Sequence, residues 1–183
     1  EIPAEALYGV QTLRGIENFS ISKFRLSEYP LFIKGLAITK MAAAMANFEL
    51  GLLTVEQKDA IIAACGEILD GKHHDQFPVD MIQGGAGTTT NMNANEVIAN
   101  RALELMGHER GEYQYCSPND HVNCSQSTND AYPTAIHIGM YFKHLQLLPH
   151  LEELIASFRK KGEEFSQIIK MGRTQLEDAV PVS

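Results

Sequence analysis

The feature that most constrains the fold is an apolar seam at helical spacing near the end of the chain. Its members recur every three or four positions: Leu148, Leu151, Ile155, Phe158, Gly162, Phe165 and Ile169. This spacing predicts a long bundle helix that begins near Asp130. Pro149 lies inside it, so we expect a kink or a fresh helix start there. Because a bundle needs several such helices, the seam predicts a helical-bundle domain.

Apolar periodicity predicts three earlier helices. The first begins at Pro30, the second opens with a capping box at residues 54–57, and the third runs from about 91 to 106. Residues 1–29 show no helical period, so we expect loop with short strands there. Strand signal is scarce elsewhere, which makes the fold class mainly α.

These segments predict two domains that meet near Asn129. Residues 1–129 would form a helical N-terminal domain with short strands and long loops. Residues 130–183 would supply the first long helix or helices of a central helical-bundle domain. The chain has no initiator Met and stops immediately after a motif rich in functional groups, so we expect a fragment of a longer protein.

Charge and cysteine content narrow the class of function. The chain has 15 Lys and Arg against 23 Asp and Glu, a formal charge of −8, which disfavours nucleic acid as a partner. Its three cysteines show no disulfide or metal-ligand pattern, as is typical of a cytoplasmic protein. The most apolar stretch, residues 31–53, is interrupted by Lys34, Lys40 and Glu49, so no membrane span is expected. A net-acidic chain can still bind an anion through clustered hydrogen-bond donors.

The first cluster of such donors is the glycine-rich run at residues 84–95. Glycines let backbone N–H groups approach a ligand, and the following helix directs its positive end there. Thr88 and its neighbours add side-chain donors. A capped helix after a flexible loop is the plainer interpretation of these residue types. A nucleotide loop has little support, because the run lacks the Lys of GxxxxGK[ST] and does not match GxGxxG.

The second cluster is Ser125–Asp130, at the start of the long helix. Ser127, Thr128 and Asn129 would direct their donors and the helix dipole toward one point, whereas a helix cap needs only one such residue. This excess slightly favours a functional site. His121, just before the cluster, is more typical of a hydrogen-bonded structural histidine than of a base.

The third cluster, residues 171–181, places Thr174 beside Gln175 after the apolar seam. Taken alone, it is more typical of a helix end and turn than of a site. The run His73-His74-Asp75 is interpreted as loop, because adjacent histidines point in different directions on most backbones.

Taken together, the three clusters resemble the aspartase/fumarase superfamily over essentially the whole chain. Residues 2–12 resemble its N-terminal approach segment and residues 84–96 its first substrate loop. Residues 118–123 with 127–130 resemble the second loop, and residues 172–175 with 178–181 the third. Within the superfamily, two details favour the aspartases. Gly-Gly-Ala-Gly-Thr-Thr-Thr stands where fumarases typically have Thr-Gly-Ser-Gly-Thr-Gln-Ser. Gln175, as in other aspartases, stands where fumarases and some aspartases have His. Cys124 departs from the more usual Lys.

The resemblance implies deamination of L-aspartate to fumarate and ammonia through an aci-carboxylate intermediate. It implies a homotetramer whose active sites form where three subunits meet. It also implies that the base is a serine in a Gly-Ser-Ser loop, so no catalytic residue is assigned in these 183 residues. The substrate-binding residues that it implies are Thr88, Ser127, Thr128, Asn129, Thr174 and Gln175.

The donor chemistry fits this assignment. Ser127, Thr128 and Thr174 suit the charge on the β-carboxylate, and Thr88, Asn129 and Gln175 suit the ammonium group. No cofactor and no metal ligand are expected, while activation by a divalent metal is left open. Two alternatives remain: a class II fumarase that interconverts fumarate and malate, and an inactive lyase-fold structural module.

Overall fold

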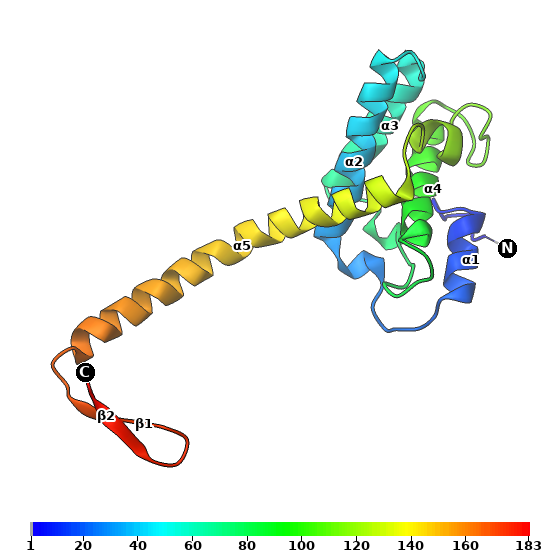
Figure 1. The fold of residues 1–183 in the computed structure, drawn as a ribbon. Coiled ribbons are helices and arrows are strands. Elements are labelled where there is room, and N and C mark those ends of the chain that lie inside the picture. The colour runs from blue at the N-terminus through cyan, green and yellow to red at the C-terminus, as the bar shows by residue number, and fades with distance from the viewer. Residues whose placement is uncertain (1) are drawn as a thin grey trace. The chain divides into compact units, whose positions relative to one another are not determined.

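The computed structural model describes residues 2–183, which form two compact units, the first ending at Phe142 and the second comprising Lys143–Ser183. The mainly α fold class is confirmed (Figure 1). The elements, in chain order, are α1 (Val10–Asn18), η1 (Leu26–Glu28), α2 (Pro30–Glu49), α3 (Val55–Leu69), η2 (His74–Gln76), α4 (Thr88–Leu105), the short π-helix η3 (Pro118–Val122), α5 (Thr128–Phe165), β1 (Lys170–Arg173) and β2 (Asp178–Val182).

Helices α2, α3 and α4 build the core of the first unit. α3 packs against both α2 and α4, and α1 lies against α4 (Figure 1). The apolar faces of the three core helices meet in side chains that are almost fully buried: Ile33 and Leu36 of α2, Ile61 and Ile68 of α3, and Val97, Ile98 and Leu103 of α4. This core fixes the N-terminal end of α4, where the first predicted donor cluster begins.

Local signals placed α2 and α3 correctly. Pro30 occupies the first turn of α2, and Gly51 follows the helix with a φ of +74°, a conformation that favours glycine. Thr54 and Gln57 form the predicted capping box of α3. Among residues 2–183, α2 has the length and apolarity that a membrane span requires. In this structure α2 packs on α3, and the side chain of its own Lys40 is fully buried.

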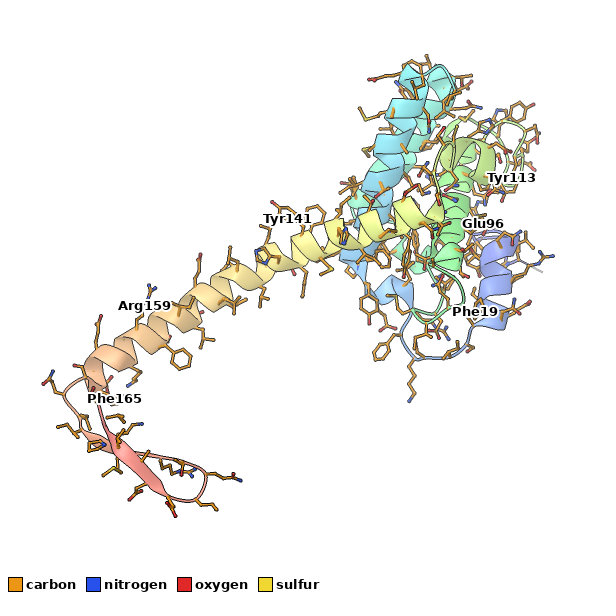
Figure 2. The ribbon with its side chains drawn as sticks, viewed as in Figure 1. Phe19, Glu96, Tyr113, Tyr141, Arg159 and Phe165 are labelled. Atoms are coloured by element: carbon orange, nitrogen blue, oxygen red, sulfur yellow. The ribbon has the colours of Figure 1, made fainter. Side chains whose placement is uncertain are left out.

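The expectation of loop with short strands over residues 1–29 was wrong for α1. This helix lacks a local side-chain cap, and Glu96 of α4 caps it instead. The Glu96 carboxylate accepts hydrogen bonds from the N–H groups of Gly9, Gln11 and Thr12 at 2.9, 2.9 and 3.0 Å, and from the Thr12 hydroxyl at 2.6 Å. Figure 2 shows Glu96 on α4 beside α1. A distant residue therefore stabilises α1, and local periodicity could not reveal the helix.

Helix α5 begins at Thr128, two residues before the predicted start, and continues through Pro149 to Phe165. Of the two outcomes expected at Pro149, a kink or a fresh helix start, the fresh start was therefore wrong. A proline removes one main-chain hydrogen bond, and the leucines, histidine and glutamates around it favour helix strongly enough for the next turns to continue. The two compact units divide within α5, after Phe142. The domain boundary near Asn129, which concerns the longer protein, stays a prediction.

The second unit contains the end of α5 and an antiparallel hairpin. β1 pairs with β2 in the register Lys170–Val182 and Met171–Pro181, with an irregularity before the Arg173–Asp178 pair. The plainer interpretation of the third cluster, a helix end and turn, was correct for the turn only. The flanking residues form strands, because the hairpin pairs their main-chain groups.

Candidate active site

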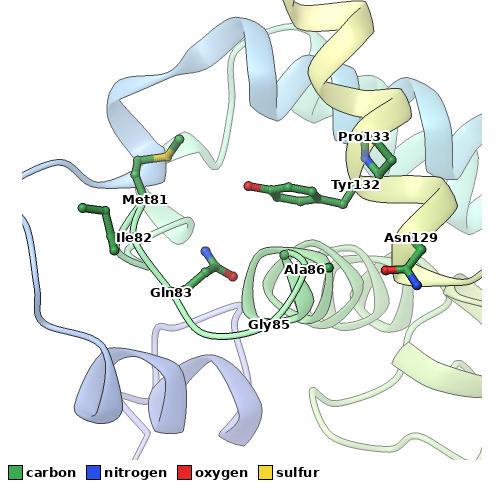
Figure 3. Close-up of a pocket in the computed structure, with 9 residues that line it drawn as sticks. Met81, Ile82, Gln83, Gly85, Ala86, Asn129, Tyr132 and Pro133 are labelled. Carbon is green, nitrogen blue, oxygen red and sulfur yellow. The ribbon is translucent and has the colours of Figure 1, made fainter.

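The residues just before α4, 84–87, form a glycine loop. A hollow of about 470 Å³ lies where this glycine loop meets the first turns of α5 (Figure 3). The residues that line it are Met81, Ile82, Gln83, Gly85, Ala86, Gly87, Asn129, Tyr132 and Pro133. Both helix N-termini, of α4 and α5, belong to the first unit and adjoin this hollow. Their dipoles place partial positive charge there, which suits an anionic ligand.

The glycine loop is closed by the side chain of Gln83. Gln83 Oε1 accepts the N–H of Thr90 at 2.9 Å, and Gln83 Nε2 donates to Thr90 Oγ1 at 2.8 Å. Gln83 thereby caps α4 from outside the helix, because Gly87 at the N-cap position has no side chain to do so. Within residues 2–183, the N–H groups of Thr88 and Thr89 have no partner. These two donors stay available for a ligand.

The start of the loop is anchored by Asp80, which is almost fully buried. Its carboxylate accepts the N–H of Ile82 at 2.8 Å and, at 2.6 and 2.7 Å, the N–H and hydroxyl of Ser22. Burial alone would raise the pKa of Asp80, but these donors and the N–H of Ile21 lower it to about 2. The carboxylate therefore stays ionised at neutral pH and holds the loop entrance to the segment after α1.

Thr128 is joined to the first cluster by Asn91. Asn91 Nδ2 donates to Thr128 Oγ1 at 3.2 Å and to Asn123 Oδ1 at 3.0 Å. Because the Thr128 oxygen accepts from Asn91, its own hydroxyl hydrogen is left to donate to another group. The structure thus brings parts of the first and second predicted clusters together around one hydroxyl donor.

Ser127 and Asn129 flank this hydroxyl. Ser127 Oγ accepts the N–H of Asn129 at 3.2 Å, the bond that an N-cap serine makes. The capping function considered from the sequence is therefore present, and the Ser127 hydroxyl hydrogen remains a donor. Asn129 is exposed and lines the hollow. Thr88, the first residue of α4, is also exposed.

Sequence reasoning missed the support that Lys40 gives to the second cluster. Lys40 Nζ donates to Asn123 Oδ1 at 2.8 Å and to Gln126 Oε1 at 3.0 Å. Burial lowers the pKa of Lys40 to about 7, although Cys65 nearby acts in the opposite direction. A lysine inside the apolar stretch of residues 31–53 was the available signal, and we used it only to exclude a membrane span. Its partners tie α2 to the loop before α5.

Three polar residues in or beside the clusters have structural contacts instead. Asn93, inside the first cluster, is buried and donates to the carbonyl of Gln76 at 2.9 Å. Asn95, also buried, donates to Met92 Sδ at 3.7 Å. His121 Nδ1 accepts the N–H of Ser117 at 2.7 Å, so the neutral ring carries its proton on Nε2. This contact agrees with the structural interpretation of His121.

Thr174 and Gln175 lie in the second unit, at the turn of the hairpin. The N–H and hydroxyl of Thr174 donate to the Glu177 carbonyl at 2.8 and 3.0 Å, and Thr174 Oγ1 accepts the Glu177 N–H at 3.2 Å. Both side chains are exposed. The third cluster is therefore an ordered turn on its own unit.

Metal-ligating side chains do not gather anywhere in the described part of the chain: residues 2–183 contain no group of three or more His, Cys, Asp or Glu that could hold an ion. The run His73-His74-Asp75 forms local contacts. His73 Nε2 pairs with Glu67 at 2.7 Å, and His74 Nε2 contacts the Ile68 carbonyl at 2.9 Å. The cofactor expectation stays a prediction.

Known proteins resemble this chain over its full length. A family model described as lyase matches residues 1–183. Aspartate ammonia-lyases from Pseudomonas canavaninivorans, Helicobacter pylori and Escherichia coli are 60, 59 and 57% identical to it. Each match covers the whole chain, which spans only 38–39% of the length of these relatives.

Solved structures show the same relationship. A fumarate lyase:delta crystallin from Brucella melitensis bound to cobalt has a TM-score of 0.92 and 54% identity, over 99% of this chain and 39% of that one. A class II fumarase from Schistosoma mansoni has a TM-score of 0.87 and 40% identity, over 100% and 38%. Sequence and fold agree, and the chain belongs to the lyase family of the aspartase/fumarase superfamily.

Proposed function

We propose that the protein to which this chain belongs converts L-aspartate to fumarate and ammonia. The observation that carries the proposal is the convergence of unpaired donors at the N-termini of α4 and α5. The Thr128 hydroxyl, held by Asn91 at 3.2 Å, joins the two N-termini. The identity to aspartate ammonia-lyases supports it.

The reaction requires such donors because its intermediate concentrates negative charge. A base removes the proton from Cβ, and the electron pair moves into the β-carboxylate to give an aci-carboxylate. The double bond then forms between Cα and Cβ as the Cα–N bond breaks, and the nitrogen leaves with that electron pair as ammonia. Preorganised hydroxyl and N–H donors stabilise the charge at the carboxylate oxygens more in the transition state than in the bound substrate.

The proposed contacts divide between the two charged ends of the reacting bond. We assign the β-carboxylate to the hydroxyls of Ser127, Thr128 and Thr174. We assign the ammonium group to oxygens of Thr88, Asn129 and Gln175. The base is proposed to be a serine in a segment beyond these residues, since the chain spans 38–39% of the length of its relatives.

The site is proposed to be completed by other subunits of a homotetramer. The apolar seam of the second unit supports this assembly, because its side chains are exposed in the single chain. Phe158 is 70% exposed and Ile169 is 78% exposed. Exposed apolar area of this kind favours association with further helices.

A class II fumarase is the second candidate, and the likeness to the fumarase from Schistosoma mansoni favours it. The two candidates differ in the group that leaves Cα, ammonia for one and water for the other. Ala86 in the first loop and Gln175 in the third motif favour the aspartase.

The test is to purify the full-length protein and to follow fumarate formation from L-aspartate and from L-malate in parallel. The proposal predicts turnover of aspartate with ammonia released in equal amount, and little or no turnover of malate. Turnover of malate without turnover of aspartate would overturn it in favour of the fumarase. Turnover of neither, by a folded oligomer, would favour the inactive structural module.

A further inference from the structure

The N-terminal ends of α4 and α5 touch at two points. In each chain segment, the two points are four residues apart. Asn91 of α4 donates to Thr128 of α5 at 3.2 Å. Four residues before Asn91, Gly87 faces Tyr132, which is four residues after Thr128. Residues four apart share one face of a helix, so the two contacts lie along a single line between the helices.

The contact at Gly87 leaves no room for a side chain. A Cβ built on Gly87 would lie 2.3–2.6 Å from Cγ, Cδ1 and Cδ2 of Tyr132. The ring therefore rests directly on the main chain of the glycine loop. Gly87 also has a φ of +86°, which favours glycine independently. Two separate requirements converge on this one position.

The Tyr132 ring also packs against α2. Phe32 of α2 packs edge-on against it, with ring centroids 5.5 Å apart and an interplanar angle of 72°, a favourable aromatic geometry. Figure 3 shows the ring extending from α5 over the glycine loop, with its hydroxyl directed toward Met81. Within residues 2–183 no hydrogen bond holds the hydroxyl, whose pKa is raised by burial alone, so the fixed part of the residue is its ring.

We propose that Tyr132 is a positioning residue, which sets the glycine loop relative to the donors of α5 by packing its ring on Gly87. This inference deepens the proposed function and rests on it. Close contacts at Gly35 and Gly139 hold α5 against α2, and the Asn91–Thr128 bond joins α5 to α4. The Gly87–Tyr132 contact is the one through which α5 bears on the glycine loop itself. The hydroxyl has no part in the positioning.

The ring and hydroxyl functions are separable by substitution in the full-length protein. Tyr132→Phe keeps the ring and should retain kcat/KM within about twofold, since its hydroxyl has no protein partner. Tyr132→Leu removes the flat face on which the loop rests and should lower kcat/KM by about 10- to 100-fold, the loss that misplacement of a binding group produces. Val97→Ala, in the buried core of α4 away from the hollow, is the control for lost stability.

A second readout is independent of turnover. Hydrogen exchange of the amides of Thr90 and Asn91, which are bonded to Gln83 Oε1 and to the Gly87 carbonyl, should accelerate in Tyr132→Leu and stay at the parental rate in Tyr132→Phe and Val97→Ala. Loop exchange and kcat/KM that are unchanged in Tyr132→Leu would overturn the inference, and so would equal losses in Val97→Ala at matched Tm. All rates are measured on whichever of aspartate and malate the parent protein turns over. Failure of the proposed function therefore appears in the parent, and failure of this inference appears only in the variants.

Discussion

The two units of the chain differ in how their side chains are used. In the first unit, three buried titratable side chains have specific partners: Glu96 caps α1, Asp80 holds the loop entrance, and Lys40 holds the second cluster. In the second unit, every residue except Gly172 is exposed. Its apolar seam has the spacing of a bundle helix and no helix within its own unit to cover it (Figure 2).

This difference indicates which parts of the protein one chain can order by itself. Burial of apolar area is the main favourable term in folding, and the first unit achieves it within residues 2–142. The seam of the second unit gains that stabilisation only from further helices. The candidate site has the same division, with the donors of the first two clusters in the first unit and the Thr174 turn in the second.

The largest effect should come from removing everything beyond the 183 residues. We predict that aspartate turnover by this chain alone is at least about 10²- to 10⁴-fold slower than by the full-length protein. This factor is the contribution of a positioned base. Its solution mass should show self-association or a partly mobile second unit. Fumarate formation by the isolated chain near the parental rate would mean that the base lies within these residues, and His121 would then be reconsidered.

The next effect concerns the order of the first unit. Glu96→Ala should lower the free energy of unfolding by about 3–5 kcal/mol, because four donors lose their buried charged acceptor. Urea unfolding of the chain measures this change. Glu17→Gln, at an exposed position on α1, is the matched control and should change stability by less than about 0.5 kcal/mol. Equal changes in both variants would refute the distant cap.

A smaller effect follows from the buried ammonium group of Lys40. Its pKa in the folded chain is about 7, against about 10.4 when unfolded. Above pH 7 the unfolded state binds more protons, so stability should rise with pH. The slope rises toward about 1.4 kcal/mol per unit, which gives about 1 kcal/mol between pH 7 and about 8. Closer to pH 8.5 the unfolded thiols titrate as well.

Lys40→Met tests that slope, because it keeps a long side chain and removes the titrating group. We predict that the rise in stability between pH 7 and about 8 is lost in the variant, as measured by urea unfolding at each pH. The same rise in the variant and in the parent would show that another group produces it.

The smallest effect should appear in the second unit. Phe158→Ala in the isolated chain should change the free energy of unfolding by less than about 0.5 kcal/mol, because the side chain is 70% exposed. In the full-length oligomer the same substitution should cost about 3–5 kcal/mol if the seam is covered. Thermal unfolding of both forms provides the comparison. Equal, small effects in the two forms would contradict the account of the seam.

Sequence alone predicted the elements that carry their own signals. Helices α2 and α3 were placed from Pro30 and the Thr54–Gln57 capping box, both of which are local. Helix α1 was missed because its cap, Glu96, is more than 80 residues away. The start of α4 was predicted three residues late, since Gln83 caps it across the glycine loop.

The candidate site divides in the same manner. Unusual runs of hydroxyl and amide groups pointed to Thr88 and to residues 127–129, because packing does not explain such runs. The supporting contacts of Lys40 and Tyr132 were missed: Lys40 stands out in its apolar stretch, but neither residue indicates its partner within its own helix. Their importance depends on partners in other elements, Asn123 for Lys40 and Gly87 for Tyr132.

The central claim is that the first unit stabilises the charge that develops on the β-carboxylate through the Thr128 hydroxyl. The most direct measurement is the steady-state kinetics of full-length Thr128→Ala with L-aspartate, beside Thr134→Ala at an exposed position on α5. The account predicts a fall in kcat of about 10- to 150-fold, with a smaller change in KM, for Thr128→Ala alone. A folded Thr128→Ala protein with near-parental kcat would contradict it.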